Sequence, residues 1–351
     1  MSAPPSARAA VPSARASARP AIGLAIDTTF DDTSVALIRG RREVLADLTL
    51  SQVAAHAEFG GIVPERASRK HLEAIHPLLD HALAQARIGW RELDYVAVSN
   101  LPGLLGSILV GTTVAKTLAW VLRRPLIGVN HIEAHPYANF LVHGELPFPL
   151  LHLVAAGGHT LLIHQRAHFE GEIVGRSVDD AAGECVDKVA KMFGYPFPGG
   201  PEVDRLALAH APGPYSFPRP MLHDGSLDFS FSGLKTALLY FLKQQAGRPV
   251  AEGPVIAAFF EAVMDVLVTK TLRAARRFRT AAVTVSGGLA ASRKLRERFE
   301  ERAREAGIAL YYPPARLCTD NAAMVACLAA YRYEAGRCDG LDLEAYANLP
   351  P

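Results

Sequence analysis

The same order of predicted elements occurs twice along the chain, and this repetition limits the fold more than any single motif does. Short apolar strands are predicted at 22–26, 33–38 and 44–50 and again at 150–156, 159–165 and 172–176. Each set of three forms a meander that continues into alternating helices and strands. A duplicated α/β architecture, with two lobes and a cleft between them, fits this order. One continuous doubly wound sheet fits it less well, because both halves begin with antiparallel pairing.

The segments that follow each meander supply the other predicted elements. They are a helix within 65–87, a strand at 95–99, a helix at 103–121, a buried strand at 126–129, a strand at 281–285 and a last helix from about 320. The pair Gly157-Gly158 predicts a two-residue hairpin turn. The most apolar segment, 101–122, contains Lys116 and several glycines, which favours a buried helix over a membrane span.

The first twenty residues differ from the rest in composition. Residues 1–20 contain three arginines and no acid, so a formal net charge of +2 leaves one net negative charge on the remainder. They have no apolar core typical of a secretion signal, and we interpret them as a disordered leader, with an organellar transit peptide as the alternative. The four cysteines form no paired motif, which indicates free thiols in a reducing compartment. We therefore expect a cytoplasmic protein, or an organellar one if the leader is a transit peptide.

A nearly neutral body argues against strong overall affinity for nucleic acid. Two local clusters of basic residues remain as candidate contacts. They are Arg66, Arg69 and Lys70, and Arg293, Lys294, Arg296 and Arg298. Each cluster is also typical of a solvated helix face, and the sequence leaves both interpretations open.

The stretch NHIEAHPY at 130–137 contains a candidate metal site. On a helix, His131 and His135 share one face and could bind the same ion. Glu133 points away from that face, so we interpret it as part of a capping box with Asn130 as the N-cap. The alternative is that both histidines are ordinary core or surface imidazoles, and Pro136 disturbs the turn between them.

A third ligand could come from CTDNAAM at 318–324. Asp320 lies where a strand ends and a helix begins, so its carboxylate could cap that helix or complete a His/His/Asp site. Imidazole and carboxylate ligands with open positions suit zinc or Fe(II).

Glycine pairs and acids provide further candidate ligand sites. The pairs are Gly157-Gly158, Gly199-Gly200 and Gly287-Gly288, each of which lets backbone amides approach an anion closely. Three pairs favour a nucleotide, whereas any one alone would be an ordinary turn. The acids Asp27, Asp31 and Asp32 crowd one strand turn and suggest metal or phosphate binding, or solvated turn residues. On a predicted helix, Asp187 could contact a ribose hydroxyl or pair with Lys188.

Six segments occur in an order and spacing that resembles one enzyme family. They are SQVAAHAEFGGIVPERASRKH, NHIEAH, DDAAGECVDKVAKMFGYPFPGGP, DFSFSGLKTA, SGGLAAS and CTDNAAM, between residues 51 and 324. Together they resemble the tRNA N6-adenosine threonylcarbamoyltransferase family, formerly described as O-sialoglycoprotein endopeptidases, over essentially everything after residue 20. The resemblance implies an actin-like (sugar kinase/Hsp70) fold of two RNase H-like lobes. We place the lobes at 21–130 and 131–321, with a C-terminal helix at about 322–344 packing back on the first lobe.

The resemblance also implies a reaction and partners. The family moves a threonylcarbamoyl group from threonylcarbamoyl-AMP to the N6 amine of the adenosine beside the anticodon, in tRNAs that read codons beginning with A. Bacterial relatives work with a pseudo-dimerising paralogue and a small ATPase subunit, whereas mitochondrial relatives can work alone. No membrane is involved.

By the same resemblance, His131, His135 and Asp320 would bind one divalent metal, Fe2+ first and Zn2+ as the alternative. Asp31 would lie near the reacting carbonyl and is the candidate general base. The adenylate would be bound by Val154, Ala155, Ala156, Gly157, Gly158, Asp187, Gly200, Asp204 and Ser292.

Four positions depart from the family pattern, one of which is Pro136 after the second histidine. Ala156 stands where a serine is usual, Ser292 where an asparagine is usual, and Pro102 lacks the glycine that normally precedes it. The departures at Ala156 and Ser292 leave an inactive nucleotide-binding scaffold as an alternative function. A metallopeptidase is a further alternative, but a zinc peptidase of the HExxH kind places its glutamate next to the first histidine, and Glu133 is two residues away.

Overall fold

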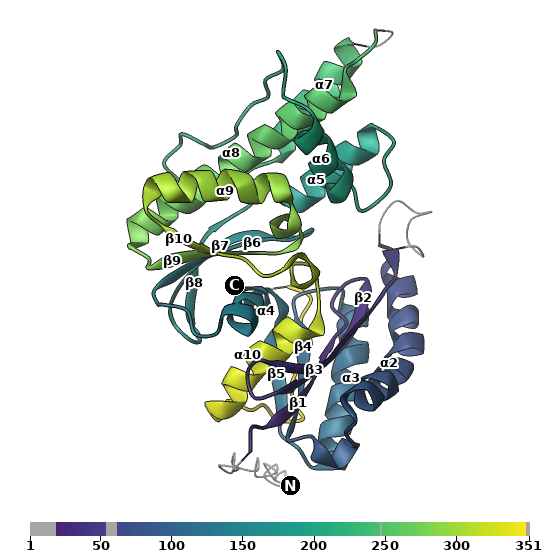
Figure 1. Cartoon of the computed structure of the whole chain (residues 1–351). Coiled ribbons are helices and arrows are strands. Elements are labelled where there is room, and N and C mark those ends of the chain that lie inside the picture. Colours follow the sequence, from purple (N-terminus) through teal and green to yellow (C-terminus); the bar gives the residue numbers. More distant parts are fainter. Residues whose placement is uncertain (1–18, 54–61, 246–247, 349–351) are drawn as a thin grey trace, which may run out of the picture. The chain divides into compact units, whose positions relative to one another are not determined.

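The protein consists of two compact units, each with its own sheet (Figure 1). The computed structural model describes residues 19–53, 62–245 and 248–348, so most of the predicted leader and part of the first family motif lie outside the described residues. Within these limits, the first unit comprises Met1–Gln52, Ile62–Tyr137 and Asn321–Pro351, and the second comprises Val53–Gly61 and Ala138–Asp320.

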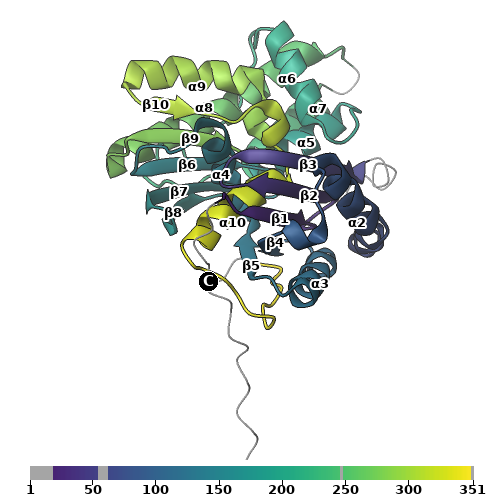
Figure 2. The same cartoon turned by 60° about the horizontal axis from the view of Figure 1, so that its bottom comes forward.

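The first unit is built on a sheet of order β3-β2-β1-β4-β5. Its strands are β1 (Ile22–Asp27), β2 (Asp32–Arg39), β3 (Glu43–Ser51), β4 (Tyr95–Leu101) and β5 (Leu126–Asn130). The first three form an antiparallel meander, and β4 and β5 continue the sheet in parallel with β1. Its helices are α2 (Pro64–Ala86), α3 (Leu105–Leu122) and α10 (Ala322–Glu334), with the short η2 (Trp90–Glu92). The helices α2 and α3 cover one face of the sheet and α10 the other (Figure 2).

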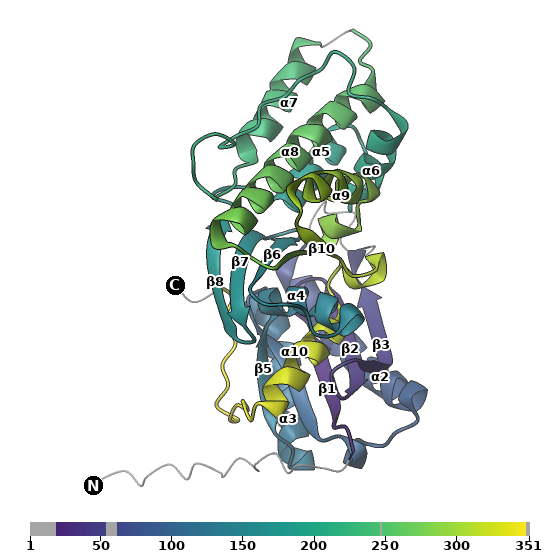
Figure 3. The ribbon, with the colours of Figure 1, turned by 60° about the vertical axis from the view of Figure 1, so that its left-hand side comes forward.

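The second unit repeats this plan with a sheet of order β10-β9-β6-β7-β8. Its strands are β6 (Leu150–Ala155), β7 (Thr160–Ala167), β8 (Glu170–Arg176), β9 (Ala282–Ser286) and β10 (Ala309–Tyr311). The meander β6-β7-β8 is antiparallel, and β9 and β10 are parallel to β6. Its helices are α5 (Ala182–Met192), α6 (Gly200–Ala209), α7 (Ser232–Gln244), α8 (Glu252–Phe278) and α9 (Arg293–Ala306), with η3 (Gly288–Ala291) and η4 (Ala315–Leu317). The long helices α8 and α9 lie side by side over one face of the sheet (Figure 3).

The two predicted meanders are confirmed, because all six strands lie within two residues of their predicted bounds. Their apolar runs are buried in two separate cores, one in each unit. The predicted hairpin turn is also confirmed: Gly157 and Gly158 occupy it, and the Ala156 amide donates to the His159 carbonyl at 2.9 Å.

The predicted burial of α3 is wrong. This helix is long and apolar enough to cross a membrane by length and composition, yet only 33% of its most apolar window is buried. Its inner face packs on β4, and Leu105, Leu109, Trp120 and Val121 are exposed on the outer face. Mean hydropathy cannot distinguish a helix with two covered faces from one with a single covered face.

The last helix is shorter than predicted. It ends at Glu334 rather than near 344, because Gly336 adopts a left-handed conformation with φ of +69°. The Arg337 amide then donates back to the Arg332 carbonyl at 2.8 Å, which is a typical way for a helix to stop.

A buried histidine in the second sheet should make folding sensitive to acid. His152 on β6 contacts the Thr284 hydroxyl and the Gln165 amide oxygen, both at 2.7 Å, and burial lowers its pKa from 6.5 to about 4. The unfolded chain therefore binds more protons than the folded protein between these two values. The free energy of unfolding should fall by about 3 kcal/mol as the pH drops from 6.5 to 4. Denaturant titrations at several pH values should show this dependence, and His152→Gln should reduce it. Equal slopes in both proteins would contradict the assignment.

Candidate functional site

Two histidines and an aspartate come together at the start of α4 (His131–His143). His131 and His135 are each 1% exposed, and their rings meet edge to face with centroids 4.9 Å apart. One ligand atom from each of His131, His135 and Asp320 lies within 4.8 Å of the other two. Asp320 directly precedes Asn321, the residue at which the chain returns to the first unit. The donor set of two imidazole nitrogens and one carboxylate oxygen suits Fe(II) or zinc.

The residues around this cluster resolve two of the alternatives raised by the sequence. Asn130 caps α4, since its side-chain oxygen accepts the Ile132 amide at 2.9 Å, and its side-chain amide donates to Glu133 at 3.3 Å. The predicted cap is therefore confirmed, and Glu133 supports it. The alternative in which Asp320 caps α10 is excluded, because Asn321 accepts the Met324 amide at 2.9 Å and serves as the cap.

A buried carboxylate fixes the orientation of His131. The Oδ2 atom of Asp27 lies 2.7 Å from His131 Nδ1, and Asp27 is 2% exposed. The backbone amide and hydroxyl of Thr29 donate to Oδ1 of Asp27, and the hydroxyl of Ser99 donates to Oδ2. Because Nδ1 of His131 is engaged by Asp27, Nε2 is the nitrogen left to bind a metal. The sequence identified Asp27 only as one of several turn acids, although its position at the end of a fully apolar strand was a signal of burial.

Asp31 lies in the turn between β1 and β2, next to Phe30. The Phe30 ring meets the edge of the His131 ring, with centroids 5.6 Å apart. His71 from α2 is fully buried and holds this turn, with Nε2 at 3.0 Å from the Phe30 carbonyl and Nδ1 at 2.8 Å from the Thr33 hydroxyl. Asp31 is therefore brought to the side of the first unit that carries His131. Sequence reasoning missed His71, because a single histidine in an amphipathic helix gives no specific signal.

The predicted phosphate loop is tightly enclosed on one side. Val154 and Ala155 belong to β6, and the loop continues through Ala156 into the glycine turn. A Cβ atom added to Gly183 would lie 2.7 Å from the Ala156 carbonyl oxygen, and one added to Gly287 would lie 2.5 Å from the Ala155 carbonyl carbon. In contrast, added Cβ atoms at Gly157 and Gly158 would meet nothing within 4 Å. The start of the loop, at Ala155 and Ala156, is thus packed closely against Gly183 and Gly287, whereas its tip, at Gly157 and Gly158, is open.

Asp187 and Gly200 are brought together, as their predicted shared role requires. The Oδ1 atom of Asp187 accepts the amides of Gly199 at 2.7 Å and Gly200 at 3.2 Å, so this carboxylate lies at the N-terminus of α6. Burial raises the pKa of Asp187. Lys188 pairs with Asp180 and Glu184, which argues against the alternative of an exposed Asp187–Lys188 pair.

Asp204 and Ser292 contact each other and cap α9. The Ser292 hydroxyl donates to Asp204 at 2.6 Å and accepts the Leu295 amide at 3.0 Å. Asp204 also accepts the backbone amides of Arg293 at 3.1 Å and Lys294 at 3.0 Å. These two predicted ligand residues therefore stabilise a helix N-terminus as well.

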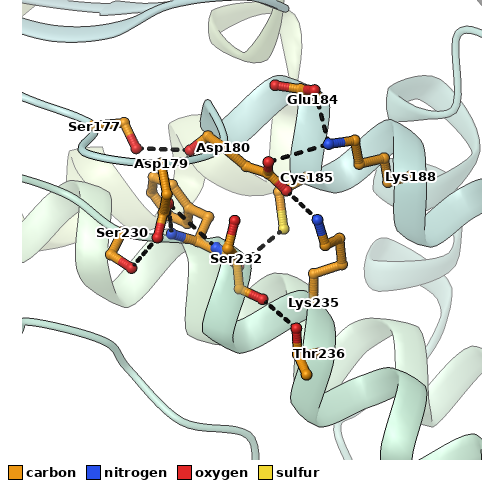
Figure 4. A network of polar contacts seen from close by, with 11 residues as sticks. Ser177, Asp179, Asp180, Glu184, Cys185, Lys188, Ser230, Ser232, Lys235 and Thr236 are labelled. Carbon is orange, nitrogen blue, oxygen red and sulfur yellow. Dashed lines mark hydrogen bonds and ion pairs between the residues drawn. The ribbon is translucent and has the colours of Figure 1, made fainter.

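A network of charged residues holds the start of α5, which carries Asp187 (Figure 4). The Asp180 carboxylate accepts hydrogen bonds from Nζ of Lys235 at 2.5 Å and Nζ of Lys188 at 3.1 Å. The Asp179 carboxylate accepts the Phe231 amide at 2.8 Å, near the start of α7. Burial opposes ionisation of Asp180, but the hydrogen bonds from the two lysines outweigh it and lower its pKa. The network ties α5 to α7 within the second unit.

The two basic clusters are largely engaged within the protein. On α2, Arg69 pairs with Glu65 and Lys70 with Glu73. On α9, Lys294 pairs with Glu297, Arg298 pairs with Asp265, and Arg296 donates to the carbonyls of Ala290 and Pro313. Among the described residues, these pairs favour a solvated helix face over a ready-made nucleic-acid surface.

Comparison with known proteins adds relatives and fold neighbours. The family model described as tRNA N6-adenosine threonylcarbamoyltransferase matches residues 43–327. A protein of that name from Moorella thermoacetica is 46% identical over 329 residues, which cover 93% of this chain and 96% of the relative. Component A of the Acidaminococcus fermentans (R)-2-hydroxyglutaryl-CoA dehydratase has a TM-score of 0.55 at 12% identity, covering 91% of this chain and 99% of that one. Full-length HypF has a TM-score of 0.60 at 15% identity, covering 90% and 56%. These neighbours have the actin-like ATPase fold, so the predicted fold class is confirmed.

Proposed function

Because the chain belongs to the tRNA N6-adenosine threonylcarbamoyltransferase family, we propose that it transfers a threonylcarbamoyl group from threonylcarbamoyl-AMP to the N6 amine of the adenosine beside the anticodon, in tRNAs that read codons beginning with A. The chain is an enzyme of tRNA modification. The main support for this proposed transfer reaction is the cluster of His131, His135 and Asp320, together with the buried Asp27 carboxylate that contacts His131.

The test is a transfer assay with unmodified tRNA, threonylcarbamoyl-AMP and the protein with its partner subunits. Mass spectrometry of the digested tRNA should detect the threonylcarbamoylated nucleoside. A tRNA whose adenosine at that position is replaced by guanosine is the control. No modified nucleoside with a competent set of partners would contradict the proposal.

We infer that the metal is Fe2+, with Zn2+ as the alternative, because the donor set of the cluster fits both. A bound metal of this kind would act as a Lewis acid on a carbonyl or phosphate oxygen. Asp27 holds His131 through Nδ1 and thereby presents Nε2, and Thr29 and Ser99 keep Asp27 in place. Such carboxylate–histidine pairs typically raise metal affinity by about 10- to 100-fold.

The second unit supplies the proposed adenylate contacts. Gly157 and Gly158 present backbone amides at the open tip of a rigid loop, and Gly200 lies at the N-terminus of α6, where amides favour an anion. Asp187 orders that N-terminus and has a second carboxylate oxygen for a ribose hydroxyl. A carbamoyl adenylate has a good leaving group, so orienting it accounts for much of the catalysis. Asp204 and Ser292 contribute through the N-terminus of α9.

We expect Asp31→Asn to reduce transfer by at least about 100-fold, since the adenine amine is a poor nucleophile and needs a carboxylate to accept its proton. Metal affinity should stay within about three-fold of the original protein, because Asp31 is not in the ligand set. Single-turnover transfer assays and metal titrations measure the two effects separately. Asp80→Asn, which changes an exposed carboxylate on α2, is the matched control. Full activity of Asp31→Asn would remove this residue from the mechanism.

The proposed partners are tRNA, a paralogue of related fold and a small ATPase, as in the bacterial system. The outer face of α3 supports docking of the paralogue, since Leu105, Leu109, Trp120 and Val121 expose apolar surface, with the partly exposed Lys116 between Leu109 and Trp120. We expect Leu109→Glu to weaken this association by at least about ten-fold, and light scattering of the mixed proteins measures it. Thr117→Glu, on the same exposed side one helical turn before Val121, tests whether any added charge has the effect. An unchanged complex with Leu109→Glu would place the partner elsewhere.

We propose a cytoplasmic location, in keeping with the bacterial relatives and the four free cysteines.

The peptidase alternative has no support from Glu133, which hydrogen-bonds to the Asn130 cap of α4. The inactive-scaffold alternative predicts weak binding of a non-hydrolysable adenylate, which calorimetry tests directly.

A further inference from the structure

The C-terminal segment after α10 lies along the free edge of the first sheet. The Asp339 amide donates to the Leu126 carbonyl at 2.8 Å, and the Gly128 amide donates to the Asp339 carboxylate at 2.8 Å. Leu343 packs against the core of the first unit directly over Gly128, where a Cβ atom would lie 2.7 Å from it. The segment thus covers the edge strand β5, which would otherwise present unpaired backbone groups.

The segment then reaches the loop between β4 and α3. The Asn100 side-chain amide donates to the Glu344 carbonyl at 2.8 Å, and the Tyr346 amide donates to the Asn100 carbonyl at 2.9 Å. The Gly103 amide donates to the Ala347 carbonyl at 3.0 Å. Three hydrogen bonds therefore hold residues 100–103 against 344–347, and Asn100 is only 5% exposed.

The 100–104 loop also contacts Thr29, the residue that hydrogen-bonds to Asp27 beside the proposed metal ligand His131. The Leu104 amide donates to the Thr29 carbonyl at 2.8 Å, and a Cβ atom on Gly103 would lie 2.4 Å from the Thr29 carbonyl oxygen. Glycine is required at 103 for this approach. Thr29 in turn donates twice to Asp27, which orients His131.

We propose that residues 344–347 form a positioning strap for the metal site, acting through the 100–104 loop, Thr29 and Asp27 on the orientation of His131. The strap lies beyond the residues matched by the family model, which end at 327. All the contacts that link residues 344–347 to His131 lie within the first unit. Each of them is either a hydrogen bond or a close backbone approach. The inference rests on the proposed metal site, because the strap matters for function only if His131 is a ligand.

The experiment uses the full-length protein, a truncation after Glu344 and a control truncation after Asn348. The first truncation removes Tyr346 and Ala347 but leaves Asp339 and Leu343 on the sheet edge. Competition of the metal-depleted proteins with a chromophoric chelator measures Co2+ affinity, and the visible spectrum of bound Co2+ reports its ligand geometry. We expect the truncation after Glu344 to bind Co2+ about five- to ten-fold more weakly with an altered spectrum, and the control to match the full chain.

Two further measurements distinguish an effect of the truncation on global stability from an effect on the orientation of His131. Hydrogen exchange of the metal-free protein should increase at residues 100–104 in the truncation after Glu344, while its melting temperature falls by no more than about 4 °C. Gly103→Ala places a Cβ atom against the Thr29 carbonyl while residues 344–347 remain in the protein, so it should weaken Co2+ binding similarly, and the double variant should lose little more. Equal Co2+ affinity and spectra in the full and truncated chains would overturn the strap alone. Failure of the full chain to bind Co2+ would overturn the metal site, and the strap with it.

Discussion

Replacing His131 with alanine is expected to lower metal affinity by at least about 100-fold and to abolish transfer. One of the three proposed protein ligands is lost, and the Asp27 carboxylate loses the ring that it orients. Metal content after dialysis and affinity by chelator competition measure the first effect, and the tRNA assay measures the second.

His143→Ala is the matched control for His131→Ala. It removes a histidine from the last turn of the same helix, where Nε2 contacts the Tyr312 carbonyl at 2.9 Å. Metal affinity should stay within about three-fold of the original protein, because His143 is outside the ligand set. Retention of metal by His131→Ala would contradict the assigned site, whereas loss of metal in both variants would point to a general effect on α4.

Gly287→Ala is expected to be the most disruptive small substitution in the second unit. The added Cβ atom would lie 2.5 Å from the Ala155 carbonyl group and 2.7 Å from the Ala156 amide nitrogen, and Gly287 has a φ of +89° that L-residues rarely adopt. Backbone cannot yield as a flexible side chain does, so the loop at 155–158 must move. We expect a loss of about 2–4 kcal/mol in the free energy of unfolding and a loss of adenylate binding.

Denaturant titration and calorimetry with a non-hydrolysable adenylate measure the two effects of Gly287→Ala. The neighbouring residue offers a control, because a Cβ atom on Gly288 would meet nothing within 4 Å. Gly288→Ala should therefore change the free energy of unfolding by less than about 1 kcal/mol. Equal effects of the two substitutions would show that the close approach to β6 is not what requires glycine.

The three residues of the proposed metal site could be predicted from the sequence to different degrees. His131 and His135 share a helix face by spacing alone, and the Asn130 cap follows from the residue preferences of helix N-termini. Asp320 was ambiguous, because two adjacent polar residues, Asp320 and Asn321, could each cap α10. Only the hydrogen bond from Met324 to Asn321 resolves this ambiguity.

The support of His131 could not be predicted, because it comes from residues distant in the chain. Asp27 and Ser99 lie 72 residues apart, and Asp27 and His131 lie 104 residues apart. The pairing of β1 with β4, and of β4 with β5, brings the ends of these strands together. The same holds for Asp204 and Ser292, which meet because α6 and α9 pack in one unit.

The sequence by itself determined the elements and their repetition, because apolar periodicity and turn residues act within a few positions along the chain. It also indicated the family, which a family model over residues 43–327 and a relative at 46% identity support. The tertiary structure alone decided which face of α3 is covered, where the C-terminal segment runs and which carboxylate orients His131. These features depend on contacts between segments that are far apart in the chain. A linear pattern of residue types does not show which of these segments lie close together in space.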